Sequence, residues 1–254
     1  MKIKTLFLLI TLLPKISVAQ LAICYDDDQF TNIRQSPSFN SKIIGKIIEG
    51  QVFAISAYKQ EENPTSDWFA ISFPKTSNSS EKEYLKFDGE ENTGYVHKSR
   101  LVKLENLKKL KITEINKNKV LHKEKDFQVS IETQIFKKSE HKIIRKKDGN
   151  YLIDGEKSYP YYGGNTTEIK SITLKNKNST YTFPKKSFKN YFMIDAAYST
   201  VYKGTKEECY LAIDAGDGAD GYSIVYCIKN NTIFSMTITS TLPWFRKNTN
   251  FFNN

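Results

Sequence analysis

The stretch of residues 30–50 constrains the fold of this chain more than any other segment. It contains a short strand at Asn32–Arg34, and Ser36–Ser38 then forces a turn, because its proline fixes φ and has no backbone N–H. A second apolar run, Ile43–Ile48, ends at the turn glycine Gly50. Two short apolar runs separated by such turn residues predict a β-hairpin.

Two later runs extend this pattern. Asp67–Ile71 contains a tryptophan, and Thr93–His97 contains Gly-Tyr-Val. Together with the hairpin, they resemble a bacterial SH3 domain, in which an N-x-R strand, a Ser/Pro turn, an Ile-Gly strand, a Trp strand and a Gly-aromatic-Val strand follow one another. The resemblance covers about residues 23–104 and places the domain at 20–104. It implies a small β-barrel that binds peptidoglycan or a protein ligand, with candidate groove aromatics, Trp68 foremost, at Tyr58, Trp68, Phe69 and Tyr95.

The rest of the chain is interpreted from its own pattern. Residues 105–126 are rich in lysine and lack Gly and Pro, which predicts a basic connector with a weak tendency to form a helix or an extended edge. Residues 246–254 are expected to form a tail. Apolar runs that alternate with Asn, Asp and Gly turns over 127–245 predict a second β-rich domain, mainly β or α+β. A helix is conceivable only near 183–197, where Phe188, Tyr191 and Phe192 would face inward. The expected strands are 127–136, 141–147, 151–153, 169–175, 179–183, 208–213, 222–229 and 232–240.

Residues 1–19 have the pattern of an export signal. Two lysines precede the apolar run Leu6–Leu13, and Ser17–Ala19 supplies the small residues of a cleavage site, so the mature chain is expected to begin at Gln20. The apolar run is shorter than the ~20 residues that cross a bilayer, and no later run is longer. We therefore expect a periplasmic or secreted protein without a transmembrane segment.

The three cysteines offer two kinds of modification. Leu21–Cys24 has the outline of a lipoprotein box, but Ile23 is bulky where such boxes need a small residue, so lipidation of Cys24 is the less favoured option. Cys209 and Cys227 flank a Gly- and Asp-rich turn, and in a hairpin they would face each other. In an oxidising compartment they could form a disulfide, although two separate buried thiols fit the sequence equally well.

The positive charge of the chain is concentrated in one window. The formal net charge is +10, and residues 98–147 contain sixteen Lys or Arg against six Asp or Glu, which accounts for all of it. Such a segment can meet anionic polymers, or it can be a solvated surface. Nucleic acid is not expected as a partner, because the window has few arginines and aromatics to stack on bases, and export removes the chain from most nucleic acids.

An acidic turn is the one candidate for a metal site. Three carboxylates on a flexible turn could hold Ca²⁺, which takes several oxygen ligands, but their i, i+3, i+6 spacing lacks the alternation of an EF-hand loop. The favoured interpretation is an ordinary hairpin turn without a cofactor. The three residues are Asp214, Asp217 and Asp220.

An aromatic turn follows the predicted strand at 151–153. Tyrosines offer rigid, amphipathic area to a protein partner or a sugar ring, and equally they can cover the end of a β core. We keep both interpretations for these candidate interface residues, which are Tyr159, Tyr161 and Tyr162.

Catalytic signatures are missing from the sequence. The histidines His97, His122 and His141 are dispersed, and no G-x-S-x-G or H-E-x-x-H motif occurs. We therefore expect an exported, non-catalytic binding protein of the bacterial cell envelope, with peptidoglycan or an envelope protein as partner. Two alternatives remain: an inhibitor or immunity-type protein that neutralises a cell-wall-degrading toxin or hydrolase through its C-terminal domain, and, less favoured, a metal-dependent enzyme.

Overall fold

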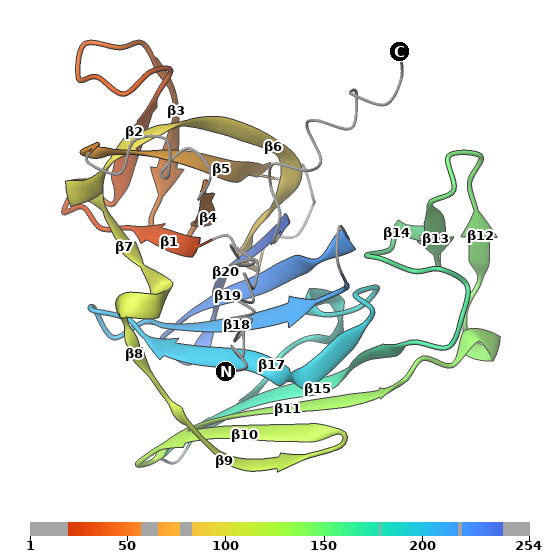
Figure 1. Ribbon diagram of the computed structural model, residues 1–254. Coiled ribbons are helices and arrows are strands. Elements are labelled where there is room, and N and C mark those ends of the chain that lie inside the picture. Colours follow the sequence, from red (N-terminus) through yellow and green to blue (C-terminus); the bar gives the residue numbers. More distant parts are fainter. Residues whose placement is uncertain (1–19, 57–65, 77–82, 178, 218–219, 241–254) are drawn as a thin grey trace, which may run out of the picture.

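The computed structural model describes residues 20–56, 66–76, 83–177, 179–217 and 220–240. These residues form a mainly β protein in which the helical segments are short 3-10 turns (Figure 1). A large curled sheet of mixed strand direction forms a half-barrel, and antiparallel sheets of five and three strands accompany it. The expected mainly β class is confirmed, and the described residues contain no α-helix.

The N-terminal strands occupy one side of the large sheet. They are rich in β-branched and aromatic residues, as expected for the strands of a pleated sheet. A hairpin of β2 (Phe30–Arg34) and β3 (Ile43–Ile48) attaches to β6, which agrees with the hairpin predicted for residues 30–50. The sheet order is β7 (Leu101–Lys103), β1 (Gln20–Cys24), β4 (Val52–Ile55), β5 (Trp68–Thr76) and β6 (Leu85–His97), and the 3-10 turns η1 (Lys98–Arg100) and η2 (Leu104–Asn106) flank β7.

Strand β4 is buried on both faces, and this places it at the centre of the molecule. The residues Val52–Ile55 are at most 1% exposed. Phe53 packs into the core of the N-terminal strands, whereas Val52 packs into a second cluster that includes Tyr210 and Cys227. Because successive side chains of a strand point to opposite faces, β4 contacts its own core on one side and the C-terminal strands on the other.

The large sheet continues into the C-terminal half through a parallel strand pair. Ser235–Thr237 runs alongside Leu85–Phe87 of β6, and the remaining pairs in this half are antiparallel. One sheet therefore spans both expected domains, and each of them keeps a core of its own. The C-terminal order is β20 (Thr232–Ser240), β19 (Tyr222–Lys229), β18 (Cys209–Ala215), β17 (Ile194–Lys203) and β8 (Lys108–Lys109).

The segment expected to be a basic connector, with a weak tendency to form a helix or an extended edge, forms strands. Within 105–126 the chain makes a hairpin that supplies two strands of the five-stranded sheet. The second of these strands alternates because it has one buried face, on which Val120 and His122 are at most 1% exposed, whereas every residue of the first strand is exposed. The sheet order is β16 (Ser179–Thr182), β15 (Thr167–Asn176), β11 (Phe127–Ile135), β10 (Lys119–Glu124) and β9 (Lys111–Asn116).

The main core lies between the five-stranded sheet and strands β17 to β20. Two tyrosines of β19 anchor it, because both rings are buried and both hydroxyls reach backbone carbonyls. The hydroxyl of Tyr226 donates to the Ser187 carbonyl at 2.8 Å, and that of Tyr222 donates to the Phe192 carbonyl at 2.7 Å. These bonds satisfy polar groups that would otherwise be costly to bury.

The helix considered near 183–197 is not formed. The segment makes a single 3-10 turn, η4 (Lys185–Ser187), then an irregular loop, and then enters β17. Its aromatic residues nevertheless face inward as predicted, since Phe188, Tyr191 and Phe192 are at most 4% exposed.

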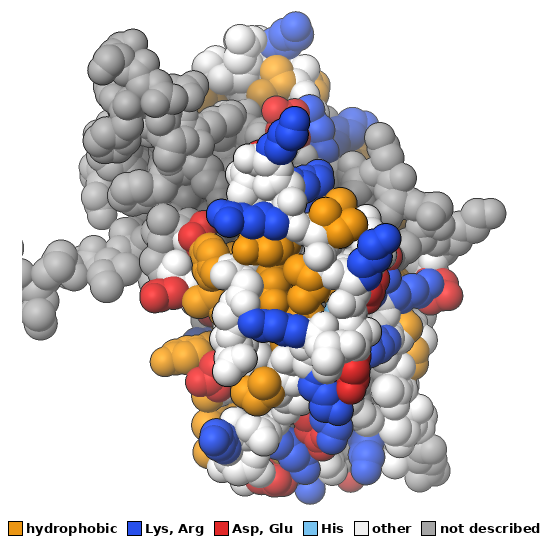
Figure 2. Space-filling model, turned by 90° about the vertical axis from the view of Figure 1, so that its right-hand side faces the viewer, with side chains coloured by type: hydrophobic (Ala, Val, Ile, Leu, Met, Phe, Trp, Pro, Cys, Tyr) orange, Lys and Arg blue, Asp and Glu red, His pale blue; other side chains and the backbone are white. Residues whose placement is uncertain are grey.

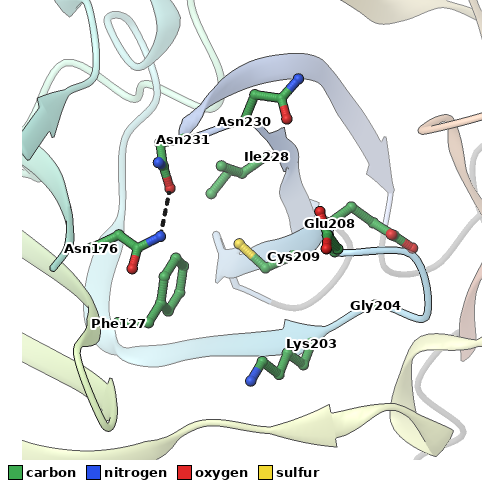
Figure 3. Close-up of a pocket in the computed structure, with 10 residues that line it drawn as sticks. Phe127, Asn176, Lys203, Gly204, Glu208, Cys209, Ile228, Asn230 and Asn231 are labelled. Atoms are coloured by element: carbon green, nitrogen blue, oxygen red, sulfur yellow. Dashed lines mark hydrogen bonds between the residues drawn. The ribbon is translucent and has the colours of Figure 1, made fainter. Parts of the chain in front are cut away.

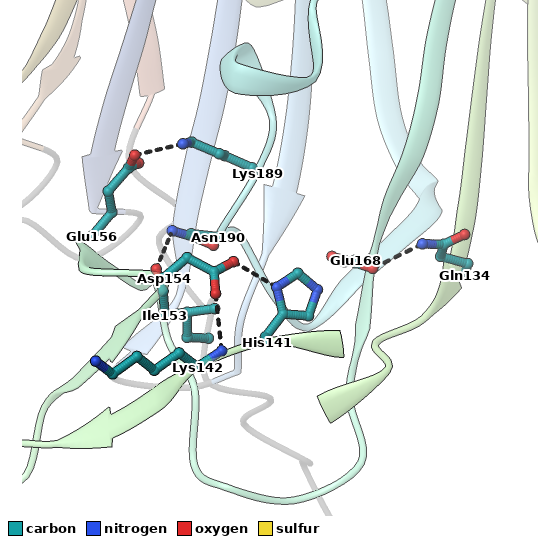
Figure 4. A network of polar contacts seen from close by, with 9 residues as sticks. All are labelled: Gln134, His141, Lys142, Ile153, Asp154, Glu156, Glu168, Lys189 and Asn190. Carbon is teal, nitrogen blue, oxygen red and sulfur yellow. Dashed lines mark hydrogen bonds and ion pairs between the residues drawn. The ribbon is translucent and has the colours of Figure 1, made fainter. Parts of the chain in front are cut away.

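A small three-stranded sheet projects from the side of the five-stranded one. Asp154, at a turn of this sheet, accepts hydrogen bonds from His141 Nδ1 at 2.7 Å and from the Lys142 backbone at 2.9 Å (Figure 4). The bond from His141 lowers the pKa of the Asp154 carboxyl. Asp154 therefore ties two strands together, and His141 has a structural partner. The elements are η3 (Lys138–Glu140), β12 (Ile143–Arg145), β13 (Tyr151–Ile153) and β14 (Glu156–Lys157).

Gly94, the glycine of the Gly-Tyr-Val run, allows strands β2 and β6 to lie close together. A Cβ atom at Gly94 would lie 2.3 Å from Ile33 Cγ2 and 3.1 Å from the Arg34 carbonyl oxygen. We expect Gly94→Ala to lower the free energy of unfolding by about 1–3 kcal/mol, because β2 must move away from β6. Urea unfolding followed by circular dichroism measures the change. Gly164→Ala, where nothing lies within 4 Å, is the control, and equal stability of the two variants would contradict the expectation.

Candidate ligand-binding groove

The register between β5 and β6 decides which aromatic residues reach the surface of the N-terminal unit. Trp68 lies opposite His97, and Phe69 lies opposite Val96. Side chains alternate between the faces of a strand, so Trp68 and His97 share the outer face. Phe69 packs on the inner face against the core, with Lys103 Nζ 5.4 Å from its ring centroid.

A third aromatic residue completes a cluster on this outer face. Phe39, from the loop between β2 and β3, has its ring centroid 4.9 Å from that of Trp68 and 5.0 Å from that of His97. The Trp68 and His97 rings are 5.3 Å apart. We call these three residues the aromatic cluster. Phe39 stays 64% exposed, so its ring is available for contact with a ligand.

The loop that carries Phe39 is held by its own polar contacts. Arg34 Nη1 donates to the Ser41 carbonyl at 2.7 Å, and the hydroxyls of Ser36 and Ser41 are 2.8 Å apart. The Gln35 backbone N–H also donates to the Lys42 carbonyl at 2.9 Å. The Ser/Pro turn predicted from the sequence therefore reverses the chain and also positions the exposed ring of Phe39.

Charged residues of both signs surround the aromatic cluster. The pocket here has a volume of about 190 Å³, and the walls include Asp28 and Arg34. Arg100 Nη1 forms an ion pair with Asp26 Oδ2 at 2.7 Å. At the rim, Lys98 pairs with Asp67 at 2.5 Å and lowers the pKa of that carboxyl. An aromatic floor between carboxylates and guanidiniums suits a ligand with apolar, cationic and anionic parts. The lining residues are Asp26, Asp28, Phe30, Thr31, Asn32, Arg34, Phe39, Trp68, His97 and Arg100.

The hydrogen bonding of His97 fixes its tautomer in the neutral state. Its Nδ1 accepts from the Ser99 backbone N–H at 3.3 Å and lies 2.8 Å from the Ser99 hydroxyl. The proton of the neutral ring is therefore on Nε2, which can donate to an acceptor on a ligand.

The four residues that the sequence suggested for the groove lie in different places. Trp68 lines the groove. Tyr95, opposite Ala70, is on the same face of the sheet as Trp68 but does not line the pocket, and Phe69 faces the core. Tyr58 lies outside the described residues. Sequence reasoning missed Phe39, although it is the one aromatic residue in the loop of the predicted hairpin, and that position was a usable signal.

The acidic turn does not assemble a metal site in the described part of the chain. Asp214 belongs to β18 and accepts from the Ser223 hydroxyl at 2.5 Å, while Asp220 accepts from the Tyr162 hydroxyl. Asp217 lies in the turn, and Gly218 is outside the described residues. No group of three His, Cys, Asp or Glu side chains placed for a metal ion occurs among the residues described.

The aromatic turn is mostly core. Tyr161 is 5% exposed and packs edge-on against Phe136, and Tyr159 is half-buried with its ring 5.5 Å from that of Tyr191. Burial makes Tyr161 unsuitable as an interface residue. Of the three candidates only Tyr162 is well exposed, at 61%. The side of the molecule that carries the three-stranded sheet has hydrophobic side chains at its centre, bordered by Lys and Arg (Figure 2).

The disulfide considered between Cys209 and Cys227 is not formed. Cys209 lies opposite Ile228, and Cys227 lies opposite Tyr210, so the two cysteines are offset by one residue. A one-residue offset places side chains on opposite faces of a sheet. Both thiols are buried and free, in different cores. Burial raises the pKa of each to about 12, so both are unreactive at neutral pH.

The chain matches no protein-family model, no curated protein and no solved structure. Within the described residues, no helix is long and apolar enough to cross a membrane. The function is therefore argued from the geometry of the groove.

Proposed function

We propose that this chain is an exported, non-catalytic binding protein of the bacterial cell envelope, and that its N-terminal groove binds peptidoglycan. The observation that carries the proposal is the aromatic cluster, which exposes Phe39 between acidic and basic walls. Peptidoglycan combines sugar rings, which stack on aromatic faces, with short peptides that bear ammonium and carboxylate groups. Asp28 would meet the ammonium groups, and Arg34 would meet the carboxylates.

The SH3-like sequence pattern supports the same proposal. Each of the runs that carry the resemblance contributes to the groove, through Asn32 and Arg34, Trp68, and His97. The export pattern of residues 1–19 would bring the chain to the compartment where peptidoglycan is found. We further propose that SH3-like barrel architecture describes the N-terminal unit.

Sedimentation with purified cell-wall sacculi tests this function. We expect the chain to co-sediment, and expect Phe39→Ala and Trp68→Ala each to weaken binding at least about tenfold, since aromatic residues that a ligand covers dominate such sites. Phe39→Ala is the sharper variant, because an exposed loop residue can be removed with little effect on folding. Tyr198→Ala, which removes another exposed aromatic ring, is the matched control.

Salt separates groove binding from general attraction to the basic surface. Binding through the groove should persist at moderate ionic strength, whereas binding through the lysine-rich strands β8 to β10 should vanish as salt rises. Absence of co-sedimentation at moderate salt, or equal binding by Phe39→Ala, Trp68→Ala and Tyr198→Ala, would refute the proposal.

A further inference from the structure

A second cavity lies at one end of the main core and shares no lining residue with the groove. Its volume is about 610 Å³, within the range of roughly 300–1,000 Å³ usual for small-molecule sites. Phe127 at the start of β11 and Asn176 at the end of β15 form one wall, and the turn at Asn230–Asn231 forms another (Figure 3). The loop from Lys203 to Glu208 closes the remaining side.

The inner surface of this cavity is apolar. Cys209 and Ile228 are buried at its base, and the half-buried ring of Phe127 forms its side. The thiol of Cys209 stays protonated, because burial raises its pKa to about 12. Cys209 therefore offers an apolar contact and not a nucleophile.

Of the three charged residues that line the cavity, Lys203 and Glu208 have partners, whereas the side chain of Glu207 is exposed to solvent. Lys203 Nζ lies 3.1 Å from Glu124 Oε2. The carboxylate of Glu208 accepts the backbone N–H groups of Thr205 at 3.2 Å and Lys206 at 2.8 Å. The one lining charge without a partner among the described residues, Glu207, is exposed to solvent, where an attraction is screened, so the inner walls favour a neutral ligand.

The polar groups that remain are side-chain amides. Asn176 Nδ2 donates to Asn231 Oδ1 at 3.2 Å, and this bond fixes both amides at the mouth. The Asn176 amide oxygen lies on the side of the Phe127 ring (Figure 3). Asn230 is exposed at the same rim. Planar amides that offer donors and acceptors beside a flat ring can bond hydroxyl groups while the ring covers an apolar surface.

We propose that this cavity is a binding site for a neutral carbohydrate of one or two sugar rings. The C–H face of a pyranose would stack on Phe127, and its hydroxyls would bond the amides of Asn176, Asn230 and Asn231. A long acyl chain fits poorly, because the buried base formed by Cys209 and Ile228 belongs to the main core and limits the depth. This site is separate from the groove and does not depend on the function proposed for it.

Calorimetric titration of the mature chain tests the site, with N,N′-diacetylchitobiose, cellobiose and maltose as probes. We expect saturable binding of at least one of these neutral disaccharides. Asn176→Ala removes an amide, and Phe127→Leu removes the flat ring but keeps apolar volume in the core. Each should weaken binding at least about tenfold while circular dichroism shows a folded chain.

Two control variants make the outcome decisive. Asn116→Ala, which removes an exposed amide from the end of β9, and Tyr198→Ala, which removes an exposed aromatic ring from β17, should both bind like the original chain. Binding of none of the three probes would overturn the proposal. It would also be overturned if Asn176→Ala and Phe127→Leu bound normally, or if Phe39→Ala, which alters the groove, abolished disaccharide binding.

Discussion

Replacing Tyr226 by alanine is expected to lower the free energy of unfolding by about 3–5 kcal/mol, as large-to-small changes of buried aromatic residues do. Tyr226 is fully buried in the main core, edge-on to Phe183 with ring centroids 5.2 Å apart. Its removal leaves a cavity between β19 and the loop after β16, and leaves the Ser187 carbonyl without the donor it has now. Chemical unfolding followed by circular dichroism measures the loss.

Two further substitutions separate the contribution of the Tyr226 hydroxyl from that of its buried ring. Tyr226→Phe keeps the ring and loses only the hydroxyl bond to Ser187, so we expect about 1–2 kcal/mol. Tyr198→Ala removes an exposed tyrosine and should change stability by less than about 0.5 kcal/mol. A loss for Tyr226→Ala no larger than that for Tyr198→Ala would show that the core is not packed as described.

His122 should make the protein sensitive to mild acid. Its Nε2 lies 2.9 Å from the Ser199 hydroxyl, which donates to the Ala196 carbonyl at 2.6 Å, so Nε2 carries the proton of the neutral ring. Nδ1 has no partner among the described residues. Burial lowers the pKa of His122 from 6.5 to about 4. Protonating the ring would place an uncompensated charge in the core.

The direction of the pH effect follows from proton binding. Between pH 6.5 and about 4 the unfolded chain binds a proton at this position and the folded chain does not. Stability is therefore fully present above the unfolded pKa and falls as the pH drops toward 4, by on the order of 2–3 kcal/mol. Urea unfolding at a series of pH values measures this loss.

A pair of variants assigns the acid sensitivity to this histidine. His122→Gln can still donate to Ser199 but cannot gain a charge, so its stability should fall less with acid by about the same 2–3 kcal/mol. His97→Gln changes a histidine outside the core and should keep the original pH dependence. If the pH dependence were the same in His122→Gln as in the unaltered chain, burial of a neutral His122 would be contradicted.

Much of the fold could be predicted because Asn, Asp and Gly turns mark the ends of most strands in this sequence. Every strand expected after residue 127 is present, and strands at 151–153, 222–229 and 232–240 have the predicted bounds. Strands β9 and β10, expected only as an extended edge within a connector, lie at or near a sheet edge, where lysines occupy the exposed face and hide the two-residue period. Strand β17 was missed because the aromatic residues just before it, Phe188, Tyr191 and Phe192, are spaced like residues on one face of a helix.

The groove was predictable only in part, for a similar reason. The family pattern singles out Trp68, but which neighbours share its face depends on strand register, and the sequence alone does not fix that register. One residue of register separates Trp68 and His97 from Phe69 and Val96. The disulfide considered between Cys209 and Cys227 depended on register in the same way. The two cysteines are equally far from the centre of the turn, but in the actual pairing each lies opposite the neighbour of the other.

The parallel pair between β6 and β20 has a consequence for how this protein is made. A ribosome delivers Leu85–Phe87 long before Ser235–Thr237, its neighbours in the finished sheet. Until β20 emerges, the N-terminal strands present an open edge that could pair with another chain. Completion of the sheet thus waits for β20, and nascent chains that stop before it would expose an unpaired edge that favours aggregation.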